Sequence, residues 1–363
     1  MKLQVLHAAA LVFGLCAGGA GQAQPAYQYT DLGSGTAAGI NDLGQVVGAS
    51  NLGATLWSGT TAIGLTFGAG GYASAINDAG QIVGATVAHG IPEAALWNGA
   101  TLASLNGPGN GFTYANGING SGDVVGGDGV AVLWDGKTPT DLAISNGTTV
   151  AANGINNAGE IVGSSTIYVN GATVATAWQG ADPTVLQSLG GSYSEAYAVN
   201  SAGMIVGAAN TAANSSTYIA TVWNGANVTA LASLGGTKSY AFAVNNAGLI
   251  VGSSTDAAGN PYATLWDGKS VVNLNTVLNP AVTQAGWVLT LATGINNEGW
   301  IVGDAVNARL GESDAFVLRA IDPVPEPETW GMLSAGLILF GIVGRFKPVW
   351  FNERAARKRE HAG

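Results

Sequence analysis

A ten-residue pattern of apolar and polar positions occurs seven times along the chain. It first reads GINDLGQVVG (39–48), a short apolar piece, an Asn-x-x-Gly segment and a second apolar piece that ends in Gly. The later copies read AINDAGQIVG, GINGSGDVVG, GINNAGEIVG, AVNSAGMIVG, AVNNAGLIVG and GINNEGWIVG. Two short apolar runs on either side of an Asn-Gly turn predict a tight antiparallel hairpin. The chain therefore repeats one hairpin.

A second pattern follows every hairpin phrase except the last. It is a strand-like run that ends in Trp-x-Gly, such as LWSG or AWQG, and another short apolar run such as TLASL comes after it. One unit of roughly 40 residues therefore predicts four strands of about four to six residues each. The Trp residues of this pattern are Trp57, Trp97, Trp134, Trp178, Trp223 and Trp266.

The length of the unit predicts the fold. Four strands in roughly 40 residues is the size of a β-propeller blade, whereas the coils of a β-helix, the alternative, use much shorter repeats. YTDLG (29–33) has the pattern of a fourth strand with no unit before it, and DAFVL (314–318) that of a third strand whose own fourth is missing. Pairing the two would close a ring and remove open sheet edges. We predict an all-β, seven-bladed β-propeller over residues 24–322.

Shape explains the Asn and Gly of the hairpin phrase. Asn tolerates left-handed backbone geometry and its side chain bonds to nearby backbone, and Gly fits a positive φ. A ring of Ca²⁺ ligands would need clustered acids, and two of the seven turns contain none. We therefore expect structural turns, no metal site and no cofactor. The pairs are Asn41 and Gly44, Asn77 and Gly80, Asn119 and Gly122, Asn156 and Gly159, Asn200 and Gly203, Asn245 and Gly248, and Asn296 and Gly299.

Aromatic residues offer two candidate surfaces. The six repeat Trp residues could stack on sugars, but their constant position inside a strand favours packing between neighbouring blades. Aromatic residues outside that pattern are better candidates for exposed contacts, and several directly precede a hairpin phrase, as in GGSYSEAYAVN and GGTKSYAFAVN. In a propeller these segments would lie on one rim, which predicts a binding face. The residues are Tyr72, Phe112, Tyr114, Tyr168, Tyr193, Tyr197, Tyr218, Tyr240, Tyr262 and Trp287.

The units resemble HAF repeats, which occur in extracellular bacterial proteins and are named for a His-Ala-Phe before the Leu-Trp-like strand. The Asn-x-x-Gly-x-Ile/Val-Val-Gly half is kept in all seven units, so the resemblance covers about residues 29–318. The His-Ala-Phe half is not kept: the corresponding segments read GATLW, EAALW, VAVLW, YATLW and DAFVL. The resemblance implies an exported repeat protein.

The beginning of the chain predicts export. Lys2, an apolar run over residues 3–17 and the small-x-small sequence Gly21-Gln22-Ala23 indicate a signal peptide over residues 1–23 that is cleaved after Ala23. The only cysteine, Cys16, lies inside this segment, and the bulky Leu15 before it disfavours a lipid anchor. The mature chain would contain no cysteine, so a buried core rather than disulfides must hold it together.

The last part of the chain, residues 323–363, predicts a C-terminal transmembrane helix. The uncharged stretch 330–344 would span only about 22 Å as a helix, short of the roughly 30 Å hydrocarbon core. The basic end that follows, residues 345–360, favours a membrane helix over the alternative of a core helix, because positive flanks are retained on the cytoplasmic side. The cluster contains Arg345, Lys347, Arg354, Arg357, Lys358 and Arg359.

This tail resembles the PEP-CTERM sorting signal, which combines a Val-Pro-Glu-Pro motif, a short Gly-rich apolar helix and an Arg-rich end. The motif here is Val324, Pro325, Glu326 and Pro327, and the basic end is longer than the usual short Arg run. The resemblance implies processing by an exosortase, a membrane cysteine transpeptidase-like enzyme of Gram-negative bacteria that make exopolysaccharide. It further implies transient passage through the inner membrane and release to the cell surface or extracellular matrix.

The charge of the mature body excludes one class of partner. Without the two ends, five Lys and Arg and 18 Asp and Glu remain of the 12 and 22 in the whole chain, so residues 24–322 carry a net charge of −13. A body with five cations cannot neutralise a phosphate backbone, and we expect no binding to nucleic acid.

The side chains also argue against an enzyme. His89 is the only histidine of the body, and no cysteine nucleophile remains. A carboxylate pair for glycoside hydrolysis stays open. We predict a non-catalytic protein of the surface or exopolysaccharide matrix, with carbohydrate as its candidate ligand. The alternative is a secreted carbohydrate-active enzyme, and a third possibility is a structural protein without a ligand. The candidate acids, which lie off the repeated motifs, are Asp128, Asp182, Glu195, Asp256, Asp304, Glu312 and Asp314.

Overall fold

The structure is a computed structural model that describes residues 27–321, except 66–69, 89, 106–111, 128, 137–138, 145, 181, 213–214 and 269. The signal peptide, the Val-Pro-Glu-Pro motif, the predicted transmembrane helix and the basic end lie outside these ranges. Within the ranges, no helix is long and apolar enough to span a membrane.

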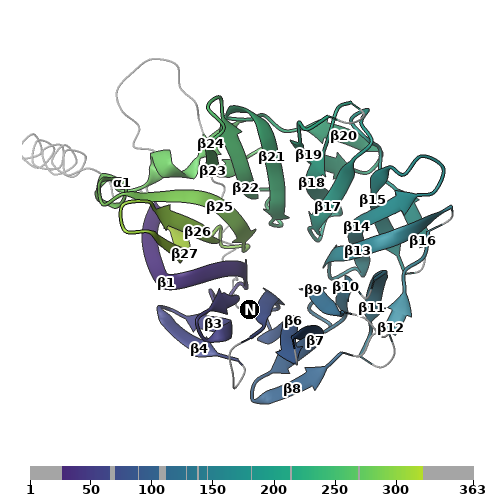
Figure 1. Ribbon diagram of the computed structural model, residues 1–363, viewed down its shortest axis with the longest axis horizontal. Helices are drawn as coiled ribbons and strands as arrows, with labels where there is room; N and C mark the ends of the chain where they lie inside the picture. The colour runs from purple at the N-terminus through teal and green to yellow at the C-terminus, as the bar shows by residue number, and fades with distance from the viewer. Residues whose placement is uncertain are drawn as a thin grey trace, which may run out of the picture. The chain divides into compact units, whose positions relative to one another are not determined.

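The described chain is all-β, as predicted, and its sheets stand side by side around a central axis in a propeller-like arrangement (Figure 1). Two short helices, η1 (Leu274–Val277) and α1 (Pro280–Gln284), are the exceptions. The strands are β1 (Tyr27–Ile40), β2 (Val46–Ser50), β3 (Gly53–Ser58), β4 (Thr61–Gly64), β5 (Tyr72–Ile76), β6 (Gln81–Ala88), β7 (Ile91–Asn98), β8 (Thr101–Ser104), β9 (Tyr114–Ile118), β10 (Val124–Gly127), β11 (Ala131–Trp134), β12 (Pro139–Asp141), β13 (Gly147–Ile155), β14 (Glu160–Ile167), β15 (Thr173–Gln179), β16 (Asp182–Val185), β17 (Ser194–Val199), β18 (Met204–Ala209), β19 (Ile219–Asn224), β20 (Asn227–Ala230), β21 (Gly235–Val244), β22 (Ile250–Asp256), β23 (Pro261–Trp266), β24 (Val271–Asn273), β25 (Trp287–Ile295), β26 (Ile301–Asn307) and β27 (Glu312–Ala320).

Each repeat unit folds as the predicted antiparallel meander of four strands. Five units form separate four-stranded sheets with strands in chain order, and β5-β6-β7-β8 is one of them. The remaining sheet, β25-β26-β27-β1-β2-β3-β4, joins the last unit to the first because the long strand β1 serves both. Tyr27–Asp31 of β1 pair with β27, and Gly35–Ile40 pair with β2. YTDLG therefore pairs with DAFVL, as the repeat phase predicts.

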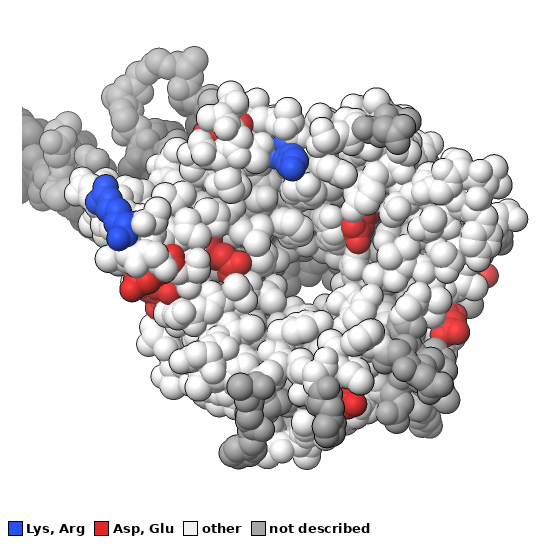
Figure 2. All heavy atoms as spheres, viewed as in Figure 1, with Lys and Arg blue, Asp and Glu red and all other residues white. Residues whose placement is uncertain are grey.

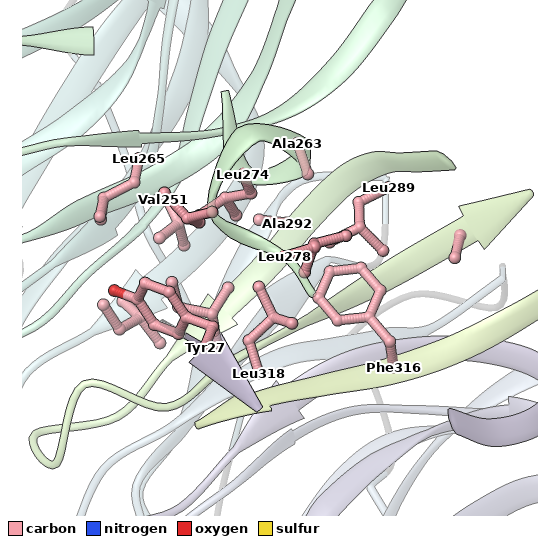
Figure 3. Close-up of a cluster of buried hydrophobic side chains, with 14 residues drawn as sticks. Tyr27, Val251, Ala263, Leu265, Leu274, Leu278, Leu289, Ala292, Phe316 and Leu318 are labelled. Atoms are coloured by element: carbon pink, nitrogen blue, oxygen red, sulfur yellow. The ribbon is translucent and has the colours of Figure 1, made fainter. Parts of the chain in front are cut away.

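The hydrophobic core lies between neighbouring units. Val47 and Ala54 of the first unit, for example, pack with Ile82 and Trp97 of the second, and the other clusters follow the same plan. The largest cluster joins the sixth and seventh units: Figure 3 shows Tyr27, Phe316 and Leu318 with Leu265, Leu274 and their neighbours. Because the units share their buried faces, the ring of sheets is stabilised as a whole.

The repeat Trp residues belong to this core, since all six are 0–4% exposed. Four indole nitrogens donate to a backbone carbonyl of the preceding unit: Trp57 to Leu32, Trp178 to Ala143, Trp223 to Gln187 and Trp266 to Ala232, at 2.7–3.1 Å. In the seventh unit Leu318 stands at the position of the repeat Trp. It pairs with Ile301, just as Trp266 of the sixth unit pairs with Ile250. These Trp residues therefore pack between units and are not available for stacking on sugars.

A half-buried carboxyl ties the last unit to the first. Asp304 Oδ1 of β26 accepts the backbone N–H of Ala37 in β1 at 3.1 Å. Burial raises the pKa of Asp304 to about 6, and the hydrogen bond from Ala37 opposes that shift only in part. Near neutral pH the fold therefore holds a partly desolvated charge at the junction of its two ends.

Asp304→Asn should remove the contribution of this carboxyl to the pH dependence of the free energy of unfolding. In the native protein the protonated carboxyl is favoured, so its stabilisation is complete below about pH 4 and is lost as the pH rises toward 6. The amide keeps an acceptor for Ala37 without titrating. The free energy of unfolding of the variant, relative to that of the native protein, should therefore rise by about 2 kcal/mol as the pH increases from 4 to 7.5. Denaturant titrations at both pH values measure this difference, and an unchanged difference would contradict it.

Candidate binding site at the central channel

The seven repeat Asn residues form a closed hydrogen-bonded ring. Each side-chain Nδ2 donates to the backbone carbonyl of the Asn in the next unit, and each Asn is only 3–6% exposed. The bonds run from Asn41 to Asn77, Asn77 to Asn119, Asn119 to Asn156, Asn156 to Asn200, Asn200 to Asn245, Asn245 to Asn296 and Asn296 back to Asn41, at 2.9–3.5 Å. The side chain thus links neighbouring units as well as shaping its own turn.

The rest of each Asn side chain fixes its own hairpin. The Oδ1 of Asn200, for example, accepts the backbone N–H groups of Ala202 and Met204 at 3.0 and 2.9 Å. The turn Gly residues have positive φ, as at Gly203 (77°). The polar atoms of the ring are therefore used by the protein itself. No group of three metal-ligating side chains occurs among the residues that the structure describes.

The Gly that ends each hairpin phrase allows two strands to approach closely. A Cβ on Gly207 would overlap the carbonyl oxygen of Glu195 on the neighbouring strand, and a Cβ on Gly252 would overlap that of Tyr240. The equivalent glycines of the other units meet the same obstacle. Only Gly fits there, because the first strand of each unit carries a β-bulge opposite this position.

The bulges turn one residue per unit toward the central channel. The bulged position lies three residues before the ring Asn in every unit. We call these seven residues the channel ring, and they line a cavity of about 230 Å³. The channel ring consists of Ala38, Ser74, Asn116, Asn153, Tyr197, Phe242 and Thr293. Figure 2 shows the central hollow on a face with few charged residues.

The chemical character of the channel ring changes around its circumference, from amide to aromatic side chains. Its amides come from neighbouring units at Asn116 and Asn153, and its aromatic residues from the next two units at Tyr197 and Phe242. Asn116 Nδ2 donates to the carbonyl of Ala152 at 3.0 Å and Asn153 Nδ2 to that of Ala196 at 2.9 Å. The amides are thus held in place beside an apolar wall. Bulges commonly aim side chains at functional sites in this way.

An aromatic row extends from the channel ring. It consists of Tyr197, Phe242, Tyr240, Tyr218 and Tyr193, each in ring contact with the next. The centroid separations are 5.2 Å between Tyr197 and Phe242, 5.9 Å between Phe242 and Tyr240, 5.9 Å between Tyr240 and Tyr218, and 5.2 Å between Tyr218 and Tyr193. All five side chains are half-buried, so each keeps part of its surface in solvent. The row joins the fifth and sixth units.

One carboxylate is fixed beside this row. Glu195 Oε2 accepts the hydroxyl of Tyr193 at 2.5 Å, and its Oε1 accepts Asn153 Nδ2 at 3.1 Å. Burial, followed by the charge of Glu195, raises the pKa of Tyr197, and burial together with the bond to Glu195 raises that of Tyr193. Both tyrosine hydroxyls therefore stay protonated at physiological pH. The carboxylate of Glu195 is held between Tyr193 of the aromatic row and Asn153 of the channel ring.

The other predicted aromatic residues lie outside the row. Phe112 and Tyr168 are 60% and 71% exposed and Tyr72 is 38% exposed, while Trp287 packs against the largest buried cluster. Burial, followed by the neighbouring Tyr114, raises the pKa of Tyr72. The sequence prediction thus contained four members of the row, Tyr193, Tyr197, Tyr218 and Tyr240, among other residues, and it missed Phe242. It also missed the amides of the channel ring.

The remaining predicted acids do not join Glu195. Asp304 lies at the junction described above, and Asp314 faces Asp31, where burial and the charge of Asp31 raise the pKa of Asp314. Asp256 accepts the N–H groups of Ala258 and Asn260 in its own turn, and hydrogen bonds from Asn260 lower its pKa. Asp182 and Glu312 are exposed, and Asp128 lies outside the described ranges.

No protein-family model matches the chain, and no curated protein sequence matches it.

Proposed function

We propose that this protein is an exported seven-bladed β-propeller that an exosortase sorts to the cell surface or extracellular matrix, where it binds carbohydrate without catalysis. The aromatic row carries the proposal for the ligand. Half-buried aromatic rings offer an apolar surface for sugar rings, and the neighbouring amides and carboxylate offer hydrogen bonds to hydroxyl groups. Such a mixture is typical of a carbohydrate site.

The seven-bladed closure is supported by the two ends of the repeat region. Strand β1 completes the last unit and begins the first, and the bond from Asn296 to Asn41 completes the ring of Asn side chains. Export and sorting are supported by the sequence pattern at the two termini, which combines a signal peptide with a Val-Pro-Glu-Pro motif, an apolar stretch and a basic end.

Tyr218→Ala should weaken carbohydrate binding about fivefold to tenfold. The substitution removes the ring that contacts both Tyr193 and Tyr240, so the row is interrupted. The measurement is a binding isotherm of the purified full chain with the best ligand from a panel of neutral and charged polysaccharides. Tyr168→Ala is the matched control, since Tyr168 is exposed and outside the row. Equal losses in the two variants would place the site elsewhere.

The same panel separates binding from catalysis. A binding protein leaves the polysaccharide intact, whereas an enzyme releases reducing ends over time. Release that disappears on changing one Asp or Glu to its amide would replace the proposal with a carbohydrate-active enzyme. No binding and no turnover on the panel would favour a structural protein without a ligand.

A further inference from the structure

The carboxylate at the aromatic row has unused capacity for donors. An ionised carboxylate offers about four lone-pair positions, and within the described ranges Glu195 accepts two hydrogen bonds, from Tyr193 and Asn153. Both bonds hold its orientation and leave the remaining positions for a ligand. A ligand group that donates several hydrogen bonds, and that carries positive charge, gains most from such an acceptor.

The rings beside Glu195 favour the same kind of group. Tyr193 donates its hydroxyl to this carboxylate, and Tyr197, two residues after Glu195 on the same strand, contacts Phe242 in the channel ring. The faces of aromatic rings attract cations, and a carboxylate beside them strengthens that attraction. Lys238 is exposed and its backbone pairs with that of Tyr218, whereas Glu195 accepts a hydrogen bond from Asn153 of the channel ring. A ligand cation is therefore best placed at the channel end.

The size of the cavity and the charge of the body limit the ligand further. A cavity of about 230 Å³ is smaller than the roughly 300–1,000 Å³ that encloses a whole small-molecule ligand. A polymer must therefore lie along the row, with one sugar at the mouth of the channel. The net charge of −13 on residues 24–322 repels polysaccharides of uronic acids and attracts cationic ones.

We propose that the aromatic row binds an amino-sugar polysaccharide, with a free ammonium group of the polymer on Glu195 and the sugar rings against Tyr197, Phe242 and Tyr240. This assignment rests on the proposed carbohydrate-binding function and names its ligand class. The ammonium donates to the free positions of the carboxylate, while the rings contact the apolar faces of successive sugars.

The test compares three β-1,4-linked hexamers of matched length: glucosamine, N-acetylglucosamine and glucose. Calorimetry on the full chain should show the glucosamine hexamer binding about tenfold more tightly than the acetylated one, whose nitrogen carries no charge. Glu195→Gln should reduce this preference to near unity, because the amide keeps the shape of the side chain but carries no charge. Asp182→Asn is the matched control, since it removes one charge from the exposed outer strand β16.

Each outcome separates the two proposals. Equal affinity for the charged and neutral hexamers would overturn the amino-sugar assignment and leave carbohydrate binding in place. Binding of none of the three, together with no binding across the polysaccharide panel, would overturn both. Equal losses in Glu195→Gln and Asp182→Asn would show that the net charge of the body, and not this carboxylate, attracts the polymer. The comparison of hexamers on the native protein stands even where a variant fails to fold.

Discussion

Asn200→Asp is expected to lower the free energy of unfolding by about 3–5 kcal/mol, because it places an uncompensated charge in a buried ring. Asn200 Nδ2 donates to the carbonyl of Asn245 at 3.0 Å, and the side chain is 5% exposed. The substitution keeps the shape and the acceptor for Met204 but turns a second oxygen toward that carbonyl. The ring is then broken at one link, between the fifth and sixth units.

Denaturant titration at pH 7.5 measures this loss, and a lower pH adds a second test. A protonated carboxyl can donate to the carbonyl of Asn245, so the loss should shrink as the new group takes up its proton. Asn246→Asp is the control: Asn246 is exposed and its side chain accepts the N–H of Ser201, so we expect a change within about 1 kcal/mol. The ring would have no special role if the two variants lost the same stability.

The Asn ring also shows where prediction from the sequence ends. The turn itself was predictable, because the bonds from Asn Oδ1 to residues two and four positions on are local. The bond from Nδ2 reaches an Asn 36 to 51 residues away, or 255 residues away at the closure. No local sequence pattern predicts this hydrogen bond, because it depends on how neighbouring sheets pack.

The pairing of the chain ends was predictable for a different reason. A strict repeat fixes which strand each segment must be, so YTDLG and DAFVL could be assigned as the missing fourth strand and its third-strand partner. The structure pairs Tyr29 with Leu318 and Asp31 with Phe316 accordingly. The sequence could not indicate that β1 would continue without interruption into the first unit, because the bend at Gly33 to Gly35 is a property of the backbone.

The aromatic row was predicted only in outline. The sequence singled out four of its five members, but nothing local separates Tyr240, which joins the row, from Tyr72, which stands at the same place before a hairpin phrase and lies outside the row. The amides Asn116 and Asn153 were missed because a β-bulge cannot be read from alternation. One signal was present: directly before the hairpin phrase, three residues before the ring Asn, the side chain varies from Ala38 to Phe242. Variation at one position of a repeated element is typical of a ligand-contacting residue.

Gly252→Ala should show that the same bulge supports both the fold and the site. An added Cβ would overlap the carbonyl oxygen of Tyr240 on the neighbouring strand, so the two strands must separate. We expect a loss of about 3 kcal/mol or more in the free energy of unfolding, the upper range for overpacking. Because Tyr240 moves with its backbone, carbohydrate affinity should fall in molecules that remain folded.

Gly259→Ala distinguishes this close approach from a general effect of replacing glycine. Gly259 lies in the turn between β22 and β23 with a φ of 89°, and an added Cβ there has no atom within 4 Å. Its cost is therefore confined to the backbone, about 1–2 kcal/mol, and carbohydrate affinity should not change. Thermal unfolding and glycan binding of both variants test the comparison. A Gly252 variant as stable as the Gly259 variant, with native affinity, would mean that the strands can separate without disturbing the row.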